Sequence, residues 1–139
     1  MSNASVLIAL AKLGMLYLLE KLFRTITVPT VVFAEVTRDI KKPGAKILKE
    51  AEWITVIEPS NKALVNMLLD FLDEGEANAI ELAREINADL VLLDEKEARR
   101  IARRLGLKIL GTLGILILAK RKGHLKLVKP LIENLYLKI

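Results

Sequence analysis

The chain has 139 residues, no cysteine, one histidine and a formal net charge of +5 at pH 7. The absence of cysteine excludes disulfides, thiolate catalysis and cysteine-ligated zinc, and one histidine cannot by itself support a histidine-rich metal centre. This length fits one domain spanning residues 1–139, with enough chain to build a sizeable core.

The hydrophobic content of 53% is high, yet Lys12 and Glu20 interrupt the most apolar stretch of the chain. We therefore expect no membrane helix, and no basic segment precedes this stretch as it would in a signal peptide. The sequence predicts a cytoplasmic protein. Glutamine is absent and charged residues make up 28%, which resembles the usage of a heat-adapted organism.

Hydrophobic periodicity predicts helices that alternate with short strands. In chain order, helices are expected over 6–12, 15–23, 30–40, 45–52, 62–72, 74–86, 95–105, 112–122 and 125–139, and strands over 26–28, 53–57, 89–93 and 108–110. We expect Ser5 to cap the first helix. This order, with apolar strands, predicts an α/β fold in which helices cover both faces of a short parallel sheet.

Asp94 stands where the apolar run 89–93 stops and a helix begins. In open α/β sheets the carboxyl ends of the strands border the ligand crevice, so Asp94 is a candidate functional residue. The alternative is structural, because Asp94 and Glu97 also have the spacing of a helix capping box. Asp73 and Glu76 have the same spacing and the same alternative.

Two further acids accompany Asp94. Glu35 is set into an apolar helix, and Glu76 lies in the first turn of another. Glu35 either meets a cation or faces water beside its charged neighbours. Parallel strands bring their carboxyl ends to one edge, so we expect these three carboxylates to converge there, where they would repel one another unless a cation lay between them. Oxygen ligands without cysteine favour Mg²⁺ or Mn²⁺, as in nucleases.

Five blocks of sequence resemble PIN domains, in particular the toxin-like, VapC-like branch of archaea and bacteria. They are SNASVLIALAK (2–12), VPTVVFAEV (28–36), GEANAIELA (75–83), LLDEKEAR (92–99) and GTLG (111–114). The resemblance covers nearly the whole chain. It implies a three-layer α/β/α sandwich around a short parallel sheet, dependence on Mg²⁺ or Mn²⁺, and cleavage of single-stranded RNA. A small antitoxin-like partner and a homodimer are implied as well.

By position, Glu35, Glu76 and Asp94 match acids of the family's quartet. The remaining acid is usually an aspartate that ends the first strand, and here Asn3 takes its place, with most of that strand missing. Four residues are expected to support the site: Ser5, Glu95, Glu97 and Thr112.

Asn3 leaves two functions open. The chain is either a metal-dependent endoribonuclease, weakened by the missing charge, or an inactive PIN-like scaffold that binds protein or RNA as a dimer. Four arginines on the expected outer face of the helix after Asp94 form either an RNA track or a solvated surface: Arg99, Arg100, Arg103 and Arg104. A phosphoacceptor domain like a response regulator is disfavoured, because it needs a pair of acids at the end of the first strand.

Overall fold

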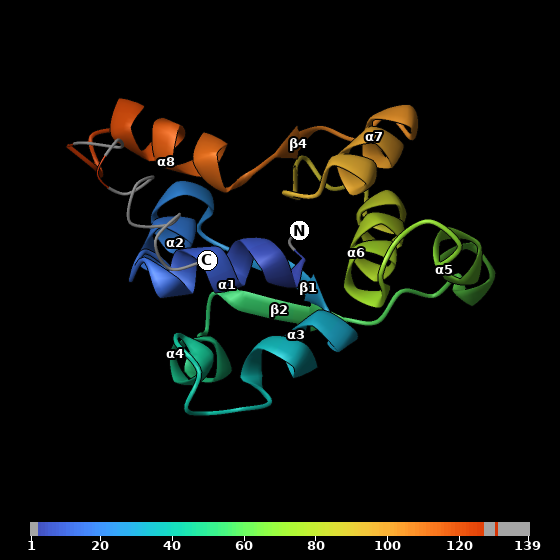
Figure 1. Ribbon diagram of the computed structural model, residues 1–139, viewed down its shortest axis with the longest axis horizontal. Coiled ribbons are helices and arrows are strands. Elements are labelled where there is room, and N and C mark those ends of the chain that lie inside the picture. The colour runs from blue at the N-terminus through green and yellow to red at the C-terminus, as the bar shows by residue number, and fades with distance from the viewer. Residues whose placement is uncertain (1–2, 127–129, 131–139) are drawn as a thin grey trace.

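The computed structural model describes residues 3–126 and 130 (Figure 1). Eight helices and four short strands alternate in this part of the chain. The helices are α1 (Ala4–Lys12), α2 (Tyr17–Phe23), α3 (Thr30–Thr37), α4 (Ala45–Glu50), α5 (Lys62–Leu68), α6 (Glu74–Glu85), α7 (Lys96–Arg104) and α8 (Thr112–Arg121). The strands are β1 (Ile26–Pro29), β2 (Ile54–Ile57), β3 (Val91–Leu92) and β4 (Ile109–Leu110). The mixed α/β class is thus confirmed.

All strand pairing among the described residues is parallel, as expected, but the sheet is divided into two halves. β1 pairs with β2 from Ile26 opposite Ile54 onwards, and β3 pairs with β4 with Val91 opposite Ile109. A cavity of about 280 Å³ is lined by residues of both halves, with Ile26 and Thr27 from β1 and Leu92 from β3.

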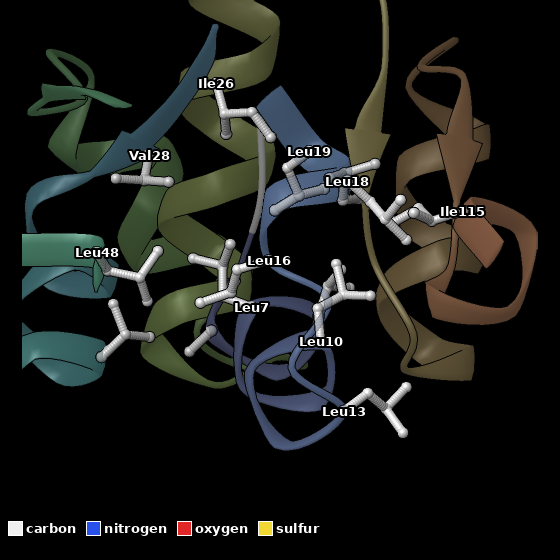
Figure 2. Close-up of a cluster of buried hydrophobic side chains, with 14 of the residues drawn as sticks. Leu7, Leu10, Leu13, Leu16, Leu18, Leu19, Ile26, Val28, Leu48 and Ile115 are labelled. Atoms are coloured by element: carbon white, nitrogen blue, oxygen red, sulfur yellow. The ribbon is translucent and has the colours of Figure 1, made fainter. Parts of the chain in front are cut away.

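Helices cover both faces of β3. Leu92 points into one buried cluster, formed mainly by α1, α2, β1, α3 and α8. Val91 and Leu93 point into another, formed by α5, α6 and α7. Side chains alternate along a strand, so these opposite directions place the strand in the middle of three layers. Figure 2 shows the first cluster, where Leu7 and Leu10 of α1 meet side chains of α2 and β1.

Several elements are shorter than the periodicity predicts. α3 ends at Thr37 rather than residue 40, α5 ends at Leu68 rather than 72, and β3 keeps only Val91 and Leu92 of the predicted 89–93. Apolar pattern marks burial, whereas a strand also needs a hydrogen-bonded neighbour. The final helix expected over 125–139 lies outside the described residues except at Leu125, Lys126 and Pro130. No helix in the described ranges is long and apolar enough to cross a membrane.

Candidate functional site

Asn3 caps α1 and lies against β3. Its Oδ1 accepts a hydrogen bond from the Val6 backbone N–H at 3.5 Å, and its own backbone N–H donates to the Leu92 carbonyl oxygen at 3.4 Å. The residue is only 2% exposed. The expected cap, Ser5, was wrong: it stands exposed in the first helical turn, because the helix begins at Ala4, two residues earlier than the expected start at residue 6.

Asp94 leaves the carboxyl end of β3 and reaches across to the end of β4. The Thr112 backbone N–H donates to Asp94 Oδ1 at 2.7 Å, and the Thr112 hydroxyl donates to Oδ2 at 2.6 Å. The capping-box alternative for Asp94 and Glu97 is wrong, because the residue at the cap position of α7 is Glu95, which makes no side-chain cap bond. Asp94 therefore belongs to a contact between two strand ends, with its carboxylate still exposed.

The space beside that contact depends on Gly111. A Cβ at this position would lie 2.7 Å from Asp94 Oδ1 and 3.3 Å from Arg99 Nη1. Such distances are shorter than ordinary contacts, so a side chain here would displace the Asp94 carboxylate. Gly111 adopts an extended backbone conformation, φ −97° and ψ 179°, that any residue can adopt. The glycine is needed for space rather than for conformational freedom.

Glu76 is buried at the start of α6. It forms the predicted capping box, in which Glu76 Oε1 accepts from the Asp73 backbone N–H at 3.1 Å and Asp73 Oδ1 accepts from the Glu76 N–H at 2.8 Å. The second oxygen, Oε2, is buried and has no hydrogen-bond partner in the described structure. The residue is 5% exposed. The cap reading is confirmed, and it accounts for only one of the two oxygens.

Burial raises the pKa of the Glu76 carboxyl above its ordinary value. The negative charges of Asp73 and Glu95 raise this pKa further, while the backbone hydrogen bond from Asp73 opposes the shift. Glu95 precedes α7 and Glu76 lies in the first turn of α6, so this effect on the pKa shows that the starts of the two helices are near each other. An ionised, buried carboxylate with an empty acceptor site and acidic neighbours gains from a cation.

The other predicted acids are placed differently. Glu97 forms an exposed ion pair with Arg100 of the same helix. Glu35 is exposed on α3, where it lines a hollow with Ile8 and Lys12 of α1. Thus Glu35 is exposed beside Lys12, in a hollow that is otherwise lined mainly by apolar residues.

The described residues contain no group of three Asp, Glu or His side chains close enough together to hold a metal ion. The acids of this edge thus do not form a complete three-carboxylate centre by themselves. Their donor chemistry nevertheless fits a hard divalent cation, because Glu76 Oε2 is a buried oxygen without a donor. Each Asp94 oxygen also retains acceptor capacity after its bond from Thr112, since a carboxylate oxygen has two lone pairs.

The four arginines of α7 differ in exposure. The expectation that all four lie together on the outer face of the helix is therefore wrong for Arg99. Arg103 and Arg104 are exposed, and Arg100 is tied to Glu97, whereas Arg99 is half-buried with its Nε in the interior. An ion pair between Glu95 and Arg99 does not form in the described structure. Sequence spacing grouped Arg99 with its neighbours, whereas in the structure its guanidinium lies near Gly111.

Comparison with protein families gives one result. The model of the family described as DUF3368, PIN domain, matches residues 1–138. No curated protein matches the chain, and no solved structure matches it.

Proposed function

Because this chain belongs to the PIN-domain family, we propose that it is a metal-dependent endoribonuclease that hydrolyses phosphodiester bonds of single-stranded RNA. The family indicates a nuclease-type fold, and PIN domains generally use divalent metal ions. The observation that carries the proposal for this chain is the buried, unpartnered Oε2 of Glu76, whose carboxyl also feels the charge of Glu95, the residue that follows Asp94.

Glu76 and Asp94 are the proposed primary ligands of Mg²⁺ or Mn²⁺, with Asn3 contributing a neutral oxygen. The hydrogen bond from Asn3 to Leu92 keeps Asn3 near Asp94, two residues further along the chain. Glu35 of α3 stays a proposed further ligand on the family resemblance alone, because in the structure it is exposed in a hollow with Lys12. When bound, such an ion polarises a phosphoryl oxygen and lowers the pKa of a water molecule that attacks phosphorus.

The protein's own groups fix the positions of these oxygens. Thr112 holds both oxygens of Asp94 with two hydrogen bonds, so the carboxylate cannot rotate freely. Asp73 holds one oxygen of Glu76 and leaves the other available. The proposed supporting roles of the remaining residues are weaker: Glu95 adds negative charge at Glu76, and the Ser5 hydroxyl is exposed on α1.

The activity is tested by incubating the protein with a labelled single-stranded RNA and Mg²⁺ or Mn²⁺, with EDTA as the blank. We expect Glu76→Gln and Asp94→Asn each to reduce cleavage by about 10–100-fold, the usual effect of disturbing metal ligation. Glu97→Gln is the matched control, since it removes one acid of the same region that is engaged in an exposed ion pair. Cleavage that persists undiminished in both site variants, or in EDTA, would overturn the proposal.

The proposed partners are a small antitoxin-like protein and a second copy of this chain. Apolar side chains support a protein partner, because Met67 and Phe71 are 57% and 64% exposed beside a hollow between α5 and α7. Arg100 and Arg104 border this hollow, which favours an acidic, amphipathic segment of a partner. Light scattering after size exclusion tests the homodimer, and a monomer at all concentrations would contradict it.

A further inference from the structure

Arg99 extends from α7 towards the loop between β4 and α8. A Cβ at residue 111 would lie 3.3 Å from Arg99 Nη1 and 2.7 Å from Asp94 Oδ1, so both atoms lie on this side of Gly111. The guanidinium nevertheless forms no ion pair with Asp94, and the buried Nε donates to no acceptor in the described chain. An arginine thus stands next to the proposed site with donors that the described protein does not use.

A purely structural role explains this arrangement poorly. A structural arginine normally donates hydrogen bonds to a carboxylate or carbonyl oxygen. Arg84 donates to Glu81 in this way, and Arg100 donates to Glu97. Leaving a buried donor unsatisfied is costly for folding. Arg99 bears that cost in the free protein, which is expected of a group whose acceptor arrives with a ligand.

The ligand chemistry follows from the side chain and its surroundings. The planar fork of a guanidinium matches two oxygens of a phosphate, and this geometry is stronger and more specific than a single contact. Arg99 Nη1 and Asp94 Oδ1 lie on the same side of the loop at Gly111, since a Cβ there would come close to both. A phosphate oxygen bound by Arg99 would therefore lie beside the Asp94 carboxylate.

We propose that Arg99 binds the phosphodiester group of the RNA substrate and positions it next to Asp94. This inference rests on the proposed function, because it assigns the substrate contact of the same site. Arg99 is the phosphate-binding arginine of α7, whereas Arg100 is occupied by Glu97 and Arg103 and Arg104 contribute only diffuse positive charge.

The test measures binding separately from cleavage. A fluorescent single-stranded RNA is titrated with the full chain in EDTA, and its anisotropy is followed at several salt concentrations. Arg99→Gln is expected to weaken binding by about tenfold or more, as loss of a hydrogen bond to a charged group does. The slope of log K against log salt should fall by about 0.7, the value for one phosphate contact on a single strand.

Arg100→Gln is the matched control, because it removes the same charge from the adjacent position. We expect this variant to stay within about twofold of the parent affinity, since its guanidinium is committed to Glu97. Arg99→Lys keeps the charge and loses the fork, and it should show an intermediate affinity. If Arg99→Gln does not fold, as judged by circular dichroism, the Arg99→Lys variant decides the matter.

Equal affinities of the Arg99 and Arg100 variants would overturn this inference while leaving the cleavage proposal intact, provided that the parent binds and cleaves RNA. A parent protein that neither binds nor cleaves the RNA would overturn both. A selective loss at Arg99 that accompanies normal folding supports the assignment.

Discussion

Asp94 and Thr112 join the ends of two neighbouring parallel strands through two hydrogen bonds, although they lie 18 residues apart in the sequence. One bond comes from the backbone of Thr112 and one from its hydroxyl, so both oxygens of the carboxylate are fixed. The pair sets the direction of the acid that ends β3, and it ties α8 to the same edge.

Replacing Thr112 by valine should therefore affect both stability and activity. Valine keeps the shape of the buried side chain but removes the bond to Asp94 Oδ2, which costs about 1.5–3 kcal/mol for a hydrogen bond to a charged group. Urea unfolding measures this loss. Thr112→Ser keeps the hydroxyl, so it should retain RNA cleavage where Thr112→Val loses it, and equal activity of the two variants would contradict this role.

Gly111→Ala should damage the site more than Gly114→Ala, although both replace a glycine of the same turn. The new methyl at residue 111 meets the Asp94 carboxylate, which Thr112 holds in place, whereas the methyl at residue 114 meets the flexible side chain of Leu110. We expect Gly111→Ala to cost about 1–3 kcal/mol through overpacking and to reduce cleavage. Unfolding and cleavage assays on both variants test this, and a Gly111→Ala protein as active as Gly114→Ala would count against a crowded Asp94.

The buried carboxyl of Glu76 predicts a pH dependence of stability. Burial raises its pKa in the folded protein, so the folded state binds this proton more tightly than the unfolded state. Between the ordinary value of 4.5 and the raised folded value, stability should fall as pH rises, and above that window the destabilisation is complete. Glu76→Gln should remove this slope and raise stability at neutral pH, as urea unfolding across pH would show. An unchanged slope in the variant would place its origin elsewhere.

Asn3→Asp should strengthen metal binding, but the charge it adds at this buried position should destabilise the metal-free protein. Asparagine and aspartate cap helices about equally well, so the bond to Val6 persists. A unit charge about 4 Å from another contributes roughly 4 kcal/mol before desolvation at an effective dielectric of about 20, and a divalent ion doubles this. We expect Mn²⁺ affinity by calorimetry to rise by about tenfold or more. An unchanged affinity would exclude Asn3 from the ion's surroundings.

The fold was predictable because the hydrophobic pattern of each segment and the order of the segments along the chain indicate the same layered architecture. Alternating helices and apolar strands predicted a parallel α/β architecture, and the structure confirms it with β1 beside β2 and β3 beside β4. The length of the strand at 89–93 was overestimated, since the sequence from Leu90 to Leu93 is apolar but only Val91 and Leu92 pair in register with β4. The pattern of apolar residues predicts which residues are buried, whereas the pairing of strands depends on residues that are distant in the sequence.

The site was less predictable, because identical spacings have different outcomes. Asp73 and Glu76 form a capping box, while Asp94 and Glu97 with the same spacing do not, since Asp94 turns to Thr112 instead. No local rule distinguishes the two pairs. The same limit hid Arg99, whose guanidinium lies near Gly111, a residue distant in the sequence.

The central claim is that the unpartnered oxygen of Glu76 is a metal ligand at the edge formed by Asp94 and Asn3. Anomalous diffraction from crystals grown with Mn²⁺ tests it most directly. We predict an ion at about 2.1 Å from Glu76 Oε2, a normal distance for a small hard cation and an oxygen ligand, with Asp94 in the same coordination sphere. Bound Mn²⁺ found only at other positions, with Glu76 Oε2 left without a ligand, would contradict the account.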